Sequence, residues 1–113
     1  MFTTTKKDMY PLPEKAYEVD PPVEKIEEAG GFYFRSIIIR KGTFVPQHSH
    51  DYKHATLVAF GSVRGWVGNE WIGDKFRGEA FEIEAGKTHT FQALEDAMLV
   101  CVHTTQGALC LSQ

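Results

Sequence analysis

The feature that most constrains the fold is a succession of short segments rich in aromatic and β-branched residues, which fills the chain from residue 31 onward. Gly, Asn and Asp separate these segments, and both properties favour strands over helices. We expect strands over residues 32–40, 43–50, 54–60, 63–67, 70–76, 79–84, 88–93 and 98–104. The Gly68-Asn69 pair between two Trp-containing segments predicts a hairpin turn. Many short strands at regular spacing indicate an all-β sandwich or barrel, of which the double-sheet jelly roll is one form.

The first 24 residues differ from the rest, because they are rich in Pro, Thr and charged residues. Prolines interrupt a regular strand ladder at Pro11, Pro13, Pro21 and Pro22. We therefore predict an extended N-terminal arm over residues 1–24 and a single β-barrel domain over residues 25–113, with one possible short helix at residues 22–29. Aromatic and apolar side chains in the arm, such as Tyr10 and Leu12, could pack on a sheet of this chain or of a partner.

Size and charge exclude several classes of protein. A chain of 113 residues suits one domain. The net charge of −3 and the pI near 5.9 argue against nucleic acid as a partner. The two cysteines, Cys101 and Cys110, form neither a close metal-binding pair nor a disulfide framework. With no signal-peptide pattern and no apolar run long enough to cross a bilayer, we expect a soluble cytoplasmic protein without a membrane partner.

Three of the five histidines, His48, His50 and His54, fall within seven residues. Side chains alternate along a strand, so His48 and His50 point the same way, and residues 51–53 can turn the chain into the next strand. His89 begins a later strand. The cluster could be a chance grouping or a pH sensor, but four neutral imidazoles from separate strands would also form a nitrogen-rich site for a transition metal.

The spacing around the first three histidines is Gly42-x5-His48-x-His50-x3-His54-x6-Gly61. It resembles the first sequence motif of the cupin superfamily, Gly-x5-His-x-His-x3,4-Glu-x6-Gly, at every interval. The departure is His54, which stands where the family usually carries glutamate.

A second stretch of the sequence resembles the second motif of the same superfamily. The sequence Gly78-x5-Glu84-x-Gly86-x2-His89-x3-Ala93 follows Gly-x5-Pro-x-Gly-x2-His-x3-Asn, with Glu84 in place of the proline and Ala93 in place of the asparagine. Two motifs in the right order and at a suitable separation identify the chain as similar to a small single-domain cupin. The resemblance implies a double-stranded β-helix, or jelly-roll barrel.

The resemblance also implies a metal site. His48, His50 and His89 occupy positions that bind metal in metal-bearing cupins, and His54 follows by position, either as a direct ligand or as a residue behind the ligands. We expect one divalent transition metal per chain, which could be Fe, Zn, Ni, Mn or Cu. Without a carboxylate ligand the site would keep a charge of about +2, which favours an anionic or chelating small-molecule ligand.

Three functions stay open. The first is a dioxygenase-like, metal-dependent enzyme acting on a small anionic or chelating organic substrate. A metal-dependent isomerase or lyase would need a general base, for which the sequence offers only Tyr52, Glu84 and His103 as candidate catalytic residues. The third is a non-catalytic module that binds a metal or a small ligand.

We also expect a homodimer. Small jelly rolls leave sheet edges open, and strand-rich proteins cover such edges. Cupins of this size resemble one another in forming dimers, and the N-terminal arm is a candidate for exchange between subunits. On that hypothesis, removal of residues 1–22 shifts the dimer toward monomer.

Overall fold

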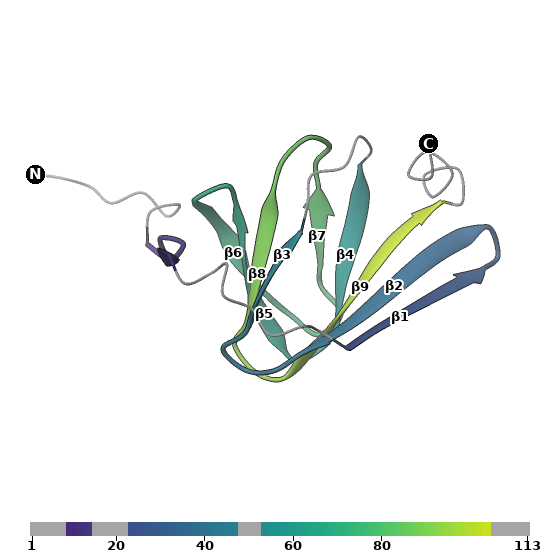
Figure 1. Ribbon diagram of the computed structural model, residues 1–113, viewed down its shortest axis with the longest axis horizontal. Helices are drawn as coiled ribbons and strands as arrows, with labels where there is room; N and C mark the ends of the chain where they lie inside the picture. The colour runs from purple at the N-terminus through teal and green to yellow at the C-terminus, as the bar shows by residue number, and fades with distance from the viewer. Residues whose placement is uncertain (1–8, 15–22, 48–52, 105–113) are drawn as a thin grey trace, which may run out of the picture.

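The computed structural model describes residues 9–14, 23–47 and 53–104. Within these ranges the chain forms β-strands and no α-helix (Figure 1). The strands are β1 (Val23–Ala29), β2 (Phe32–Ile39), β3 (Phe44–Gln47), β4 (His54–Phe60), β5 (Ser62–Val67), β6 (Glu70–Phe76), β7 (Ala80–Ile83), β8 (His89–Ala93) and β9 (Ala97–Thr104). None of the described residues belongs to a helix long and apolar enough to span a membrane. The cytoplasmic location stays a prediction.

The strands form two antiparallel sheets. One has five strands in the order β1-β2-β9-β4-β7, and the other has four in the order β3-β8-β5-β6. Consecutive strands repeatedly fall in opposite sheets, so the chain crosses between them as it does in a jelly roll. The predicted all-β jelly-roll class is therefore confirmed.

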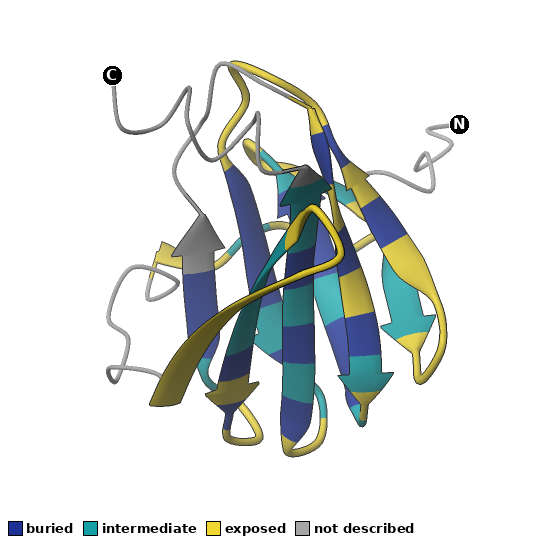
Figure 2. Cartoon of the chain, turned by 90° about the vertical axis from the view of Figure 1, so that its right-hand side faces the viewer, coloured by how far each residue is buried: buried dark blue, intermediate teal, exposed yellow. Residues whose placement is uncertain are grey.

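Alternation of side chains along each strand builds the core between the sheets. In β4, for example, Thr56 and Val58 are buried while Ala55 and Leu57 are exposed. The same banding is visible along several strands in Figure 2. The inward-facing apolar side chains form one cluster, made of Ile37, Ile39, Val45, Val58, Val63, Phe81, Ile83, Phe91, Ala93, Ala97 and Leu99.

The short helix predicted at residues 22–29 is wrong, because Val23–Ala29 forms strand β1. Its Glu- and Lys-rich composition suits a helix, but Gly30 and Gly31 follow with φ of 58° and 81°. Two successive residues with positive φ make the tight turn that joins antiparallel strands, so β1 folds back on β2. The register begins at Ala29 opposite Phe32. Pairing within the hairpin thus overrides local helix propensity.

The predicted hairpin at Gly68-Asn69 is confirmed. These two residues form the turn between β5 and β6, and Trp66 lies opposite Trp71 in the register. The predicted strands at residues 54–60 and 70–76 match β4 and β6. Of the strand predicted at residues 43–50, the described portion forms β3, and residues 48–50 lie outside the described part of the chain.

The described segment of the N-terminal arm packs on the chain's own four-stranded sheet. Tyr10 and Leu12 contact a cluster on the outer face of this sheet, built on Phe44 and Trp66. The indole Nε1 of Trp66 donates a hydrogen bond to the carbonyl oxygen of Tyr10 at 2.6 Å. The Tyr10 ring meets Trp71 edge-on, with centroids 4.8 Å apart. The arm–barrel boundary at residues 24/25 stays a prediction, and β1 already begins at Val23.

Candidate metal site

His89 is the first residue of β8, which lies between β3 and β5 in the four-stranded sheet. It lies opposite Gln47 of β3 and opposite Val67 of β5. Within β8 it shares its parity with Phe91 and Ala93, which belong to the core between the sheets. The imidazole therefore faces the barrel interior, and the residue is only 1% exposed.

The two ring nitrogens of His89 have different surroundings. Nδ1 lies 3.1 Å from the carbonyl oxygen of Lys87, so a proton on Nδ1 donates to that carbonyl. The lone pair is then on Nε2, which is buried and has no hydrogen-bond partner among the described residues. Buried polar atoms are rarely left in this state. A histidine oriented by a backbone carbonyl, with its other nitrogen available, has the arrangement of a metal ligand.

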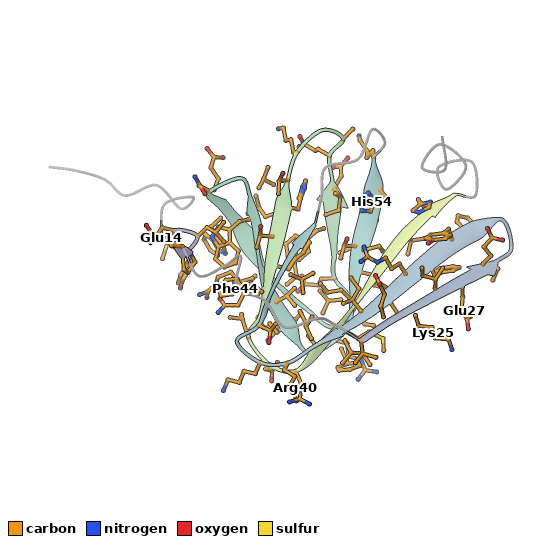
Figure 3. The ribbon with its side chains drawn as sticks, viewed as in Figure 1. Glu14, Lys25, Glu27, Arg40, Phe44 and His54 are labelled. Atoms are coloured by element: carbon orange, nitrogen blue, oxygen red, sulfur yellow. The ribbon has the colours of Figure 1, made fainter. Side chains whose placement is uncertain are left out.

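His54 begins β4 in the opposite sheet. It shares its parity with the inward-facing Thr56 and Val58, and it is 8% exposed. Figure 3 shows its ring at the upper end of β4. The rings of His54 and His103 lie nearly perpendicular to one another, with an interplanar angle of 82° and centroids 6.4 Å apart. The substitution of histidine for the family's glutamate thus leaves an imidazole facing the barrel interior.

The segment between β3 and β4 connects the neighbourhoods of these two histidines. It starts after Gln47, which is registered opposite His89, and ends at His54. The predicted ligands His48 and His50 and the candidate acid Tyr52 are in this segment and lie outside the described residues. Among the residues that are described, no three His, Cys, Asp or Glu side chains gather to hold a metal ion. The four-histidine site therefore stays a prediction.

Glu84, a candidate general base, lies in the exposed turn after β7. Its carboxylate forms an ion pair with Lys87, with an Oε2–Nζ distance of 2.7 Å. The hydrogen bond from Lys87 lowers the pKa of Glu84. A general base for neutral pH needs a raised carboxyl pKa, so these surroundings suit a surface ion pair better than catalysis.

His103, the remaining candidate, lies in β9 and is half-buried. Its ring stacks on Tyr33 of β2 with centroids 4.5 Å apart, and its position beside the His54 ring brings it toward the predicted site. The sequence did not single out Tyr33. The pairing of Tyr33 with His103 follows from the β2–β9 register, which local sequence patterns do not specify.

The carbonyl of Lys87 could not have been found from sequence either, because every residue type carries a carbonyl. The one feature of the sequence that points to this carbonyl is the position of Lys87, two residues before His89. Together, the described atoms give one buried imidazole from each sheet, facing the space between the sheets.

Comparison with solved structures identifies the fold. A cupin superfamily protein from Desulfitobacterium hafniense superimposes with a TM-score of 0.64 at 12% identity, covering 85% of this chain and 91% of its own. An RmlC-like cupin protein from Desulfovibrio desulfuricans gives a TM-score of 0.63 at 21% identity, covering 74% and 81%. Oxalate decarboxylase from Bacillus subtilis, described with Mn(II) centres, gives 0.57 at 24% identity, covering 66% of this chain and 21% of that longer one.

These similarities show that the chain has the cupin fold, as its two motifs predicted. No family model matches the sequence, and no curated protein matches it. The fold is thus assigned by structure, and a fold alone does not specify the chemistry of its site.

Proposed function

We propose that this chain is a metal-binding cupin in which His48, His50, His54 and His89 hold one divalent transition metal. The observation that carries the proposal is the buried Nε2 of His89, which has no hydrogen-bond partner in the described part of the chain, beside an Nδ1 fixed by the Lys87 carbonyl. The Mn(II) centres described for oxalate decarboxylase support the idea that this fold can hold a metal.

The donor set fits such a metal. Imidazole nitrogens are ligands for Zn, Fe, Ni, Cu and Mn, and a neutral His54 in place of a carboxylate leaves the charge of the ion uncompensated. When bound, the metal would supply a Lewis-acidic centre, and a redox-active one could also activate O₂. The protein's part is to orient the imidazoles, to exclude water with the surrounding core, and to leave space for a small anion.

The reaction class that we propose is a dioxygenase-like oxidation of a small anionic or chelating organic molecule. Glu84 is exposed and ion-paired, so it is poorly suited to remove a proton from a buried substrate. An isomerase or lyase would depend on such a base more strongly than chemistry at the metal does. This contrast favours oxygen chemistry over proton transfer.

The alternative is a non-catalytic module that captures a small acid through its metal. The described turns at the ends of the barrel are short, for instance Gly68-Asn69, and long loops are where binding specificity is usually built. A module and an enzyme would share the same ligands, so only turnover separates them.

The test is anaerobic purification followed by elemental analysis and oxygen-uptake assays with β-diketones, catechols, thiols and hydroxy acids. We expect about one metal per chain and uptake with at least one substrate class. His89→Ala should abolish binding, and His54→Glu, which restores the family's carboxylate, should retain it. Tight metal binding without turnover would favour the non-catalytic module. A wild-type protein that binds no metal would refute the proposal.

A further inference from the structure

Three ring side chains form one row across the inner face of the five-stranded sheet. Tyr33 of β2 lies opposite His103 of β9, and the β4–β9 register brings His54 to the other side of His103. The three strands are neighbours in the sheet (Figure 1). Tyr33 and His103 share their parity with core residues of β2 and β9, as His54 does in β4, so all three side chains face the space between the sheets.

The imidazole of His103 lies between two other rings. It stacks on Tyr33 with centroids 4.5 Å apart and an interplanar angle of 20°. The His54 ring is nearly perpendicular to it, at 82°. Stacking fixes the plane of the imidazole, so the ring nitrogens of His103 have a set direction, and a contact with them costs little side-chain entropy.

Exposure increases along this row away from the predicted metal ligand. His54 is 8% exposed, whereas His103 and Tyr33 are half-buried. Glu28, which lies opposite Tyr33 on β1, is exposed. The polar atoms of His103 and Tyr33 thus lie between the predicted metal site and solvent, where the far end of a bound molecule would contact them.

The row offers hydrogen-bond donors to an acidic group. Tyr33 carries a hydroxyl, and a histidine ring has an N–H in either protonation state. Among the described residues, none accepts a hydrogen bond from the Tyr33 hydroxyl. The carboxylates on the same face are on the edge strand β1, where Glu24 is paired with Arg35 and Glu28 is exposed to solvent that screens its charge.

The charge of the predicted site favours a ligand with two negative charges. Four neutral imidazoles leave a divalent ion with its full charge of about +2, which is unfavourable inside a barrel unless anions compensate it. One anionic group on the ion compensates half of this charge. Neighbouring strands are about 5 Å apart, so His103 and Tyr33 lie about 5–10 Å from His54, within reach of a second anionic group on the same small molecule.

We propose that Tyr33 and His103 bind the second acidic group of a dianionic substrate whose first, chelating group binds the metal. The inference rests on the proposed function, because it requires a metal beside His54. It narrows the substrate class to small dicarboxylic acids with a hydroxyl or keto group next to one carboxylate. Tyr33 and His103 are then residues that determine specificity, and the metal is held without them.

The test measures ligand binding to the metal-loaded, full-length protein by isothermal titration calorimetry. The probes are two matched pairs, 2-hydroxyglutarate with 2-hydroxyvalerate and 2-hydroxyadipate with 2-hydroxyhexanoate. Within each pair only the second carboxylate differs, because a methyl group replaces it. We expect at least one diacid to bind about tenfold more tightly than its monoacid, the difference that one hydrogen-bonded charge makes.

Variants then assign this preference to the row. Tyr33→Phe and His103→Phe keep a ring in the stack and remove the donors, so each should lower the diacid preference about fivefold or more, with unchanged monoacid affinity and metal content. His103→Gln, which restores an N–H donor, should recover part of the preference. Tyr10→Phe is the matched control, because it removes a hydroxyl on the outer face of the other sheet and should keep the full preference. Circular dichroism verifies that all variants are folded.

The outcomes separate the inference from the proposed function. A metal-loaded wild type that does not prefer the diacids would overturn the inference and leave the metal site in place. So would a preference that is unchanged in both Tyr33→Phe and His103→Phe. A wild type in which elemental analysis finds no bound metal would contradict the proposed function, and the inference with it.

Discussion

The guanidinium of Arg64 lies 3.6 Å from the centroid of the Tyr10 ring. The same guanidinium donates two hydrogen bonds, of 2.8 Å and 2.9 Å, to the carboxylate of Asp74 on the neighbouring strand. An aromatic residue of the N-terminal arm is thus stacked on an ion pair of the barrel, while Trp66 fixes its carbonyl. These contacts lie within one chain, so they make the described segment of the arm, residues 9–14, part of its own barrel's structure.

Replacing the Tyr10 ring should therefore destabilise the barrel. We expect Tyr10→Ala to lower the free energy of unfolding by about 1–3 kcal/mol, because it removes the stacking on Arg64 and the edge contact with Trp71. Tyr10→Phe is the matched control, since it keeps the ring and the carbonyl that accepts from Trp66, and it should lose much less. Urea unfolding measures both. Equal stability of Tyr10→Ala and the wild type would show that the arm is not bound in solution.

The ion pair between Arg64 and Asp74, on which Tyr10 stacks, predicts that the stability of the protein depends on pH. The hydrogen bond from Arg64, with a further one from Trp71, lowers the pKa of Asp74 from its ordinary value of 3.8. A carboxyl group whose pKa is lower in the folded state stabilises the protein above pH 3.8, and that contribution disappears as the pH falls through the folded-state value. Asp74→Asn should thus be less stable than the wild type by about 1–2 kcal/mol at neutral pH.

The difference between Asp74→Asn and the wild type should shrink in acid. Unfolding curves of both proteins, recorded from neutral pH down to the lowest pH at which they still fold, measure how the difference in stability decreases. A difference that is constant over the whole range would mean that Asp74 is not preferentially ionised in the folded protein. Glu79→Gln is a suitable comparison, because Glu79 is exposed and its carboxylate accepts a hydrogen bond from the backbone N–H of Phe76.

The part of the fold that could be predicted is the part specified by local sequence patterns. Short β-rich segments separated by turn residues indicated the strands, and the Gly68-Asn69 turn indicated the β5–β6 pairing. Strand β1 was missed because its Glu- and Lys-rich composition favours a helix, and only pairing with β2 overrides that preference. The order of strands in the sheets, and hence contacts such as Tyr33 on His103, depends on long-range pairing that no short window contains.

The last glycine of the first motif illustrates how a spacing pattern encodes geometry. Gly61 has a φ of 77°, and a Cβ there would overlap the carbonyl oxygen of Asp96 and stand 2.8 Å from the Cα of Ala97. The motif thus specifies a left-handed residue in close backbone contact at the β4–β5 turn. The second-motif residue Glu84 carries no such geometric signal, although a charged residue in a turn favours exposure to solvent, and Glu84 is exposed.

Gly61→Ala should accordingly cost more than an ordinary glycine substitution. We expect a loss of about 2–4 kcal/mol in the free energy of unfolding, from backbone strain and from the overlap with Asp96. Gly68→Ala is the control that isolates strain alone, because Gly68 has a φ of 58° but a Cβ at this position would meet no atom within 4 Å. Thermal unfolding of both variants gives the comparison. If Gly68→Ala costs as much as Gly61→Ala, the close contact at Asp96 contributes nothing.

The ligand assignment for the candidate metal site can be tested through stability, without knowing the substrate. A metal that binds only the folded state stabilises it by about 2.7 kcal/mol at a free concentration 100 times the dissociation constant. Adding Zn²⁺, Ni²⁺ or Mn²⁺ to chelator-treated protein should therefore raise its melting temperature.

His89→Ala should abolish this rise, because it removes the buried Nε2 that the Lys87 carbonyl orients. His103→Ala should retain it, since that ring stacks on Tyr33 and is not one of the predicted ligands. A full metal response in His89→Ala, or its loss in His103→Ala but not in His89→Ala, would show that the ligands have been assigned to the wrong histidines.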